Sequence, residues 1–208
     1  MVSKSQNLID NLLKSSFDDL ADQQIIWTSP IEQDGFAEYR NNDIILEVGL
    51  DPAETEIKLD DFWPAKDPQW DALAKTADGQ VILVEAKANI PEIVSQGTGA
   101  GEISNTIIGK SLDDTKAFLN STNDIDWSGK FYQYTNRLAY LFFLKVKCNK
   151  PTFLVNIYFI GDDAVSGPEI KQEWIAALKV LYTYLGLSRY SLSEYMADIF
   201  IDVKDLKH

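Results

Sequence analysis

The sequence is almost devoid of two residue types on which much protein chemistry depends. Its 208 residues include one cysteine, Cys148, and one histidine, His208. A single cysteine excludes an internal disulfide and a cysteine-rich zinc site. A lone histidine at the last position argues against Ser-His-Asp triads, Cys-His dyads and histidine-ligated zinc. Any chemistry in this chain must therefore use carboxylates, lysines, hydroxyls and amides.

Long apolar runs are absent as well. No stretch reaches the roughly 18 uninterrupted apolar residues of a membrane span, and the longest, around residues 138–146, is followed by lysines. The N-terminal segment lacks an apolar signal core and contains Asp10, which argues against secretion. We therefore expect a cytoplasmic protein without a membrane partner.

Positive charge is scarce, with a net charge of −13. Residues 1–70 hold five Lys/Arg against fifteen Asp/Glu, whereas residues 71–150 hold nine of each. Phosphate affinity comes mainly from lysine and arginine, so the chain alone should bind nucleic acid weakly. One reading is therefore a nuclease subunit that takes its nucleic-acid affinity from a homodimer mate or a basic partner subunit. The neutral middle third is compatible with a local phosphate site but does not by itself indicate one.

Hydrophobic residues make up 45% of the chain and no linker or repeat divides it, which predicts one domain over 1–208. Within it we expect an N-terminal helical extension (1–35), a core (36–160) and a C-terminal helix and strand (161–208). Apolar periodicity predicts an α/β fold with a mixed sheet. The expected helices cover 5–21, 36–49, 102–119, 129–146 and 166–187, the last with Pro168 in its first turn, and the expected strands cover 55–63, 70–76, 80–88, 152–160 and 196–203; within 36–49, the run IILEV also fits a strand.

The segment VILVEAKAN starts as a buried strand and then places a carboxylate and an ammonium side by side. Side chains alternate along a strand, so Glu85 and Lys87 share the face that carries Val81 and Leu83. A strand that leaves a core with a charged pair on its inner face suggests a site. The alternative without a functional role is a solvated ion pair at a strand end.

The turn before this strand, TADGQ, decides what lies opposite Glu85. A two-residue loop at 78–79 would set Ala72 across from Glu85, with Asp71 on the other face. A three-residue loop at 77–79, with its glycine in the left-handed region, would set Asp71 across from Glu85. The Asp-Gly pair is compatible with both loops. In the second register two carboxylates would repel unless a cation lies between them, which a divalent metal supplies.

Asp71 followed by Glu85-Ala86-Lys87 resembles the active-site pattern of the PD-(D/E)xK nuclease superfamily. This resemblance implies a restriction-endonuclease-like α-β-β-β-α-β core with a mixed central sheet flanked by helices. It implies metal-dependent hydrolysis of phosphodiesters in nucleic acid, with Asp71 and Glu85 holding Mg²⁺ (or Mn²⁺) and Lys87 assisting the attacking water. Trp70 stands where the family motif has proline, although Pro68 is close by.

Further site residues follow from the same resemblance. The carbonyl of Ala86 would be an extra metal ligand, and a glutamate before the first strand would be another, with Glu47 the candidate and Glu38 behind it. Gln133 and Arg137, four apart on one expected helix face, would contact substrate. Arg137 stands where the family pattern has tyrosine.

Glu92 is within reach of the strand end and is a third substrate-binding candidate. More narrowly, WDA, VEAKA and YQYTNRLA resemble a group of uncharacterised bacterial proteins, which implies the fold without a substrate. The run at 97–101 lacks the spacing of a dinucleotide-binding loop, and we interpret it as a loop beside the motif strand that closes over a substrate or becomes ordered on binding. The alternative function is a catalytically idle nuclease-like fold acting as a binding or assembly module.

Overall fold

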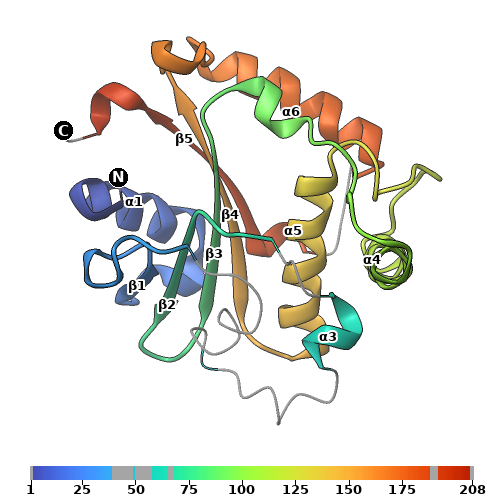
Figure 1. The fold of residues 1–208 in the computed structure, drawn as a ribbon. Coiled ribbons are helices and arrows are strands. Elements are labelled where there is room, and N and C mark those ends of the chain that lie inside the picture. The colour runs from blue at the N-terminus through green and yellow to red at the C-terminus, as the bar shows by residue number, and fades with distance from the viewer. Residues whose placement is uncertain (1, 39–48, 50–57, 65–67, 188–191, 207–208) are drawn as a thin grey trace.

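The computed structural model describes residues 2–38, 49, 58–64, 68–187 and 192–206, and within them the core is a five-stranded mixed sheet. The strands lie side by side in chain order (Figure 1). The first three are antiparallel, and the last three run parallel. They are β1 (Ile25–Ser29), β2 (Ala72–Thr76), β3 (Val81–Lys87), β4 (Thr152–Ile160) and β5 (Met196–Asp202). The predicted α/β class with a mixed sheet is confirmed.

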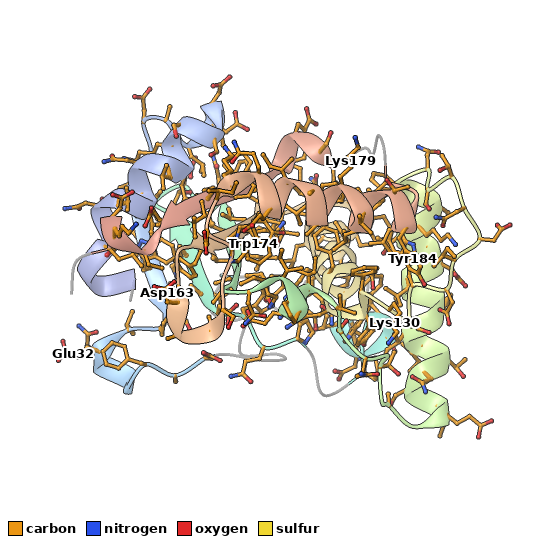
Figure 2. The ribbon with its side chains drawn as sticks, turned by 90° about the horizontal axis from the view of Figure 1, so that it is seen from above. Glu32, Lys130, Asp163, Trp174, Lys179 and Tyr184 are labelled. Carbon is orange, nitrogen blue, oxygen red and sulfur yellow. The ribbon has the colours of Figure 1, made fainter. Side chains whose placement is uncertain are left out.

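Helices cover both faces of this sheet. One face packs on α1 (Val2–Ser16), whose Ile9 and Leu13 contact a layer that includes Ile82 and Val155. The other face packs on α5 (Tyr132–Phe142) and α6 (Lys171–Leu185), and α4 (Glu102–Phe118) lies outside α5. Seen from above, α6 extends across the molecule toward α4 (Figure 2). Among the described residues, no helix is long and apolar enough to cross a membrane.

Two expected elements are wrong in type. The strand predicted over 55–63 is a short helix, α3 (Leu59–Phe62), because Leu59, Phe62 and Trp63 recur at helical spacing and are all buried. The N-terminal extension is not wholly helical, because β1 pairs with β2 at the sheet edge. The helix predicted over 36–49 lies mostly outside the described residues.

The other strands and helices have the expected type, with corrections at two helix ends. The helix expected over 129–146 becomes α5, which is followed by a π-helical turn from Phe143 to Lys147. Pro168 does not occupy the first turn of α6, which begins at Lys171. The Pro168 carbonyl instead accepts a hydrogen bond from the Gly161 amide at 2.8 Å.

The β2–β3 hairpin closes through a three-residue loop. The Thr76 amide donates to the Gln80 carbonyl and the Gly79 amide donates to the Thr76 carbonyl, both at 3.0 Å. Gly79 has φ 87°, in the left-handed region that glycine adopts at no steric cost. Ala72 pairs with Val84, so Asp71 comes next, across from Glu85. The register that opposes the two carboxylates is confirmed.

Candidate active site at the end of the hairpin

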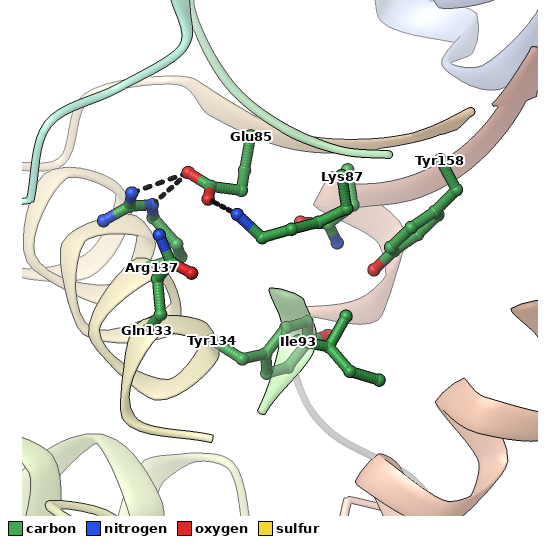
Figure 3. A pocket seen from close by; sticks show the side chains of 8 residues that line it. Glu85, Lys87, Ile93, Gln133, Tyr134, Arg137 and Tyr158 are labelled. Atoms are coloured by element: carbon green, nitrogen blue, oxygen red, sulfur yellow. Dashed lines mark hydrogen bonds and ion pairs between the residues drawn. The ribbon is translucent and has the colours of Figure 1, made fainter. Parts of the chain in front are cut away.

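Glu85 is a buried carboxylate held between two cations. It lies on the inner face of β3 and is 5% exposed. Its Oε1 pairs with the Lys87 ammonium, and its Oε2 accepts from Arg137 Nε at 2.7 Å and lies 2.6 Å from Nη2 (Figure 3). A buried carboxylate needs such partners, because burying it unpaired costs several kcal/mol. The sequence predicted that Glu85 and Lys87 share one face of β3. Arg137, on α5, is the second cation that contacts Glu85.

Arg137 is fixed on all sides. It is 3% exposed, and its Nη1 donates to Asn136 Oδ1 at 2.9 Å while Nη2 donates to the Gln69 carbonyl at 2.7 Å. Its guanidinium also stacks 4.6 Å from the centre of the Trp70 ring. The sequence assigned Arg137 to substrate binding. In the structure it anchors Glu85 and ties α5 to the segment just before β2.

Asp71 completes the pair of opposed carboxylates. Its Oδ2 accepts from the Ala86 amide at 2.7 Å, and its Oδ1 has no hydrogen-bond partner in the described part of the chain. Burial, and then the neighbouring charge of Glu85, raise the pKa of Asp71 above its ordinary value, against the opposing effects of the Ala86 amide, Lys87 and Arg137. The Ala86 amide, Lys87 and Arg137 therefore do not fully offset the cost of burying the ionised Asp71 carboxylate beside Glu85.

A small cavity of ≈ 20 Å³ opens over this cluster, between the sheet and α5. A space of this size holds about one water molecule. Gln133 and Arg137, which are four residues apart on α5, both line it. The full lining is Glu85, Lys87, Ile93, Gln133, Tyr134, Arg137, Asn156 and Tyr158 (Figure 3).

Two residues of this lining, Asn156 and Tyr158, were missed by the sequence analysis. They sit on β4 directly beside Glu85 and Lys87, and both are buried. Asn156 Nδ2 donates to Oδ1 of Asp198 on β5 at 3.0 Å, and burial raises the pKa of Asp198. A polar row thus crosses β3, β4 and β5 in register. The asparagine inside the apolar run TFLVNIYFI was the signal for it.

The remaining candidates lie elsewhere. Glu92 is exposed and does not line the cavity, since its carboxylate accepts from the Ala88 amide at 2.9 Å and the Asn89 amide group at 2.7 Å, which closes the turn after β3. Glu47 lies outside the described residues. Glu38 is exposed and accepts a hydrogen bond from the Gln69 side chain, near the start of the hairpin.

No group of three or more His, Cys, Asp or Glu side chains gathers as a metal site in the part of the chain that the structure describes. The oxygen donors near the hairpin end include the carboxylates of Asp71 and Glu85, which lie opposite each other across β2 and β3. Magnesium takes one or two protein carboxylates and completes its shell with waters and phosphate oxygens. Asp71 and Glu85 would supply the two carboxylates, and Glu85 would exchange an ion pair with Lys87 or Arg137 for the cation.

Comparisons with protein-family models, with curated proteins and with solved structures find no match to this chain. Fold and site define an α/β protein with a buried carboxylate–lysine–arginine cluster at the end of a β-hairpin. What the cluster does has to be argued from its own chemistry.

Proposed function

We propose that this chain is a metal-dependent phosphodiesterase that hydrolyses nucleic acid. The observation that carries the proposal is the opposition of Asp71 and Glu85 across the hairpin, with Lys87 on the same face and lining the same cavity as Glu85. The order of elements supports a restriction-endonuclease-like core, since α1 is followed by three antiparallel strands, with the short helix α3 between β1 and β2, and then by two helices and the parallel strand β4.

Asp71 and Glu85 would hold Mg²⁺ or Mn²⁺, with the Ala86 carbonyl as a further oxygen donor. The raised pKa of Asp71 supports this assignment, because a divalent cation would relieve the repulsion between two neighbouring carboxylates. When bound, the cation supplies Lewis-acid stabilisation of the phosphoryl oxygens.

Lys87 orients the attacking water and stabilises developing negative charge. Its side chain is 13% exposed and lines the cavity, so its ammonium acts where bulk water is largely excluded. Arg137 holds the Glu85 carboxylate in place, and the Gln133 side chain, half-buried at the cavity, contacts the substrate. Lys87, Arg137 and Gln133 all line the same cavity as Glu85.

The second candidate is a catalytically idle nuclease-like fold that acts as a binding or assembly module. It is favoured by the ion pairs, because both oxygens of Glu85 are already engaged by Lys87 and Arg137. The net charge of −13 also favours it, since phosphate contacts are few. A basic partner subunit or a dimer mate would supply the missing affinity under the first proposal.

Nucleic-acid cleavage by the purified protein tests the proposal. Single-stranded, duplex and structured DNA and RNA are offered at low salt, with Mg²⁺ and then Mn²⁺, and with a chelator as the blank. Lys87→Ala is compared with Lys179→Ala, which removes the same charge from the exposed side of α6 (Figure 2). We expect Lys87→Ala to lose activity by roughly 10²- to 10⁴-fold and Lys179→Ala to keep it.

Two outcomes contradict the proposal. One is a wild-type protein that cuts none of these substrates. The other is a cleavage rate that Lys87→Ala and Lys179→Ala share, which would assign the activity to another site or a contaminant. Either result favours the idle fold.

A further inference from the structure

A second cavity, of ≈ 250 Å³, is lined in part by Asn136, the residue before Arg137 on α5. Asn136, in its wall, accepts the hydrogen bond from Arg137 Nη1, so the cavity adjoins the cluster that holds Glu85. We call it the loop groove. Its lining is Trp63, Pro64, Pro68, Thr98, Gly99, Ala100, Gly101, Ser104, Ile108, Tyr132 and Asn136.

Asn136 presents unused donors to the loop groove. A guanidinium has only donors, so the atom that faces Arg137 must be Asn136 Oδ1, and the NH₂ end of the amide is left over. That end has no hydrogen-bond partner among the described residues, although Asn136 is 7% exposed. The residue lines the groove, so this NH₂ group can donate to an acceptor that enters from outside the chain.

The N-terminus of α4 presents further donors to the same space. This 17-residue helix begins after Gly101, which makes no side-chain cap. First-turn amides of a helix lack intrahelical partners and carry the positive end of the helix dipole, which together bind anions. Ser104, in the first turn, adds a hydroxyl to the groove lining.

The loop that leads into α4 is built to hold this shape. Thr98 donates its hydroxyl to Asn105 Oδ1 and accepts from the Ala100 amide at 3.2 Å. Gly99 has φ 60°, a conformation that other residues rarely adopt. Gly97 has no room for a side chain, because a Cβ there would lie 2.9 Å from the Ser128 carbonyl. These contacts hold Thr98, Gly99, Ala100 and Gly101 in place along the wall of the loop groove.

We propose that the loop groove binds a phosphoryl group. The side-chain amide, the hydroxyl and the helix amides are all donors, and none of the described residues in the lining carries a carboxylate. The neighbouring charge that opposes an anion is Glu102, which is exposed in the first turn of α4. This assignment rests on the proposed function: the subsite takes a backbone phosphate next to the scissile phosphate. Such a contact would position a nucleic-acid strand on an acidic chain.

An NMR titration of the Lys87→Ala protein, without metal, tests the subsite independently of catalysis. Inorganic phosphate and a trinucleotide are the two probes. We expect saturable shifts of the Gly99 and Gly101 amides and of the Asn136 side-chain amide. The trinucleotide should bind more tightly than phosphate if a strand is the ligand.

Two substitutions at position 102 provide a matched pair. Glu102→Ala removes the opposing charge and keeps the backbone amide, whereas Glu102→Pro removes both. Proline fits the first helical position, because Gly101 before it is extended, with φ −72° and ψ 167°. We expect Glu102→Pro to bind both probes about tenfold more weakly than Glu102→Ala.

Equal affinities for the two variants, or shifts that avoid these three groups, would overturn the subsite. Binding of phosphate but not of the trinucleotide would support a phosphoryl site and overturn its assignment to a strand. Because the titration needs no cleavage, a failed nuclease assay and a failed subsite remain separate results.

Discussion

Asp71 carries the charge that this site compensates least. Its pKa is raised in the folded protein, so the folded state holds this proton more tightly than the unfolded chain does. The contribution of Asp71 to stability is therefore favourable at low pH and is lost as the pH rises through its folded pKa. We expect Asp71→Asn to raise the free energy of unfolding at neutral pH, while its side-chain oxygen still accepts from the Ala86 amide.

Urea unfolding of both proteins checks this prediction. The advantage of Asp71→Asn should shrink as the pH falls below the folded pKa of Asp71, where the wild-type carboxyl is also neutral. A variant that is less stable than wild type at neutral pH would show that the ionised carboxylate is already well compensated.

The Arg137–Glu85 pair should behave as a coupled unit. Arg137→Met leaves Glu85 buried beside Lys87 alone, and breaking a buried pair in this way costs about 3–5 kcal/mol. Glu85→Gln added to Arg137→Met should recover part of that loss, since no excess negative charge then stays buried. A double-mutant cycle by urea unfolding measures the coupling, and additive losses would contradict it.

At the scale of single residues, the sequence predicted how one strand pair places its side chains, but not how the helix that covers the pair packs on it. Strand alternation and the turn glycine place Asp71, Glu85 and Lys87 together, because both follow from local geometry. Arg137 was expected at the substrate. Its burial against Glu85 depends on how α5 packs on the sheet, which residue spacing alone does not fix.

The hairpin is the element on which the site depends, and its turn can be tested separately. Gly79→Ala puts a side chain at φ 87° and should destabilise the fold by about 1 kcal/mol or more. The control is Gly109→Ala in α4, where a Cβ meets nothing within 4 Å, and it should stabilise by about 0.5–1 kcal/mol. Thermal unfolding compares them, and a destabilised control with an unaffected Gly79→Ala would reverse our account of the turn.

Elements with strong apolar signals were predicted, and the short elements β1 and α3 were not. The strand over 152–160 is nine residues long and buried on both faces, so its composition alone identifies it. β1 has five residues at the sheet edge, and α3 has four. In segments this short, tertiary packing outweighs local preference.

For the whole molecule, charge sets the conditions under which function is observed. The net charge of −13 repels nucleic acid, while the segment 71–150 that carries Lys87 and Arg137 is neutral overall. Binding to phosphates should therefore rest on a few contacts and weaken as salt rises. Under the proposed function, the loop groove and a basic partner or dimer mate would supply the affinity for a strand.

The central claim is that Asp71 and Glu85 hold a divalent cation, and a crystal soaked with Mn²⁺ tests it most directly. The account predicts an anomalous peak between the two carboxylates, within reach of the Ala86 carbonyl, and its loss in Glu85→Ala. A well-occupied manganese elsewhere on the protein, with Glu85 still paired to Arg137 and Lys87 and no peak at the hairpin, would contradict it.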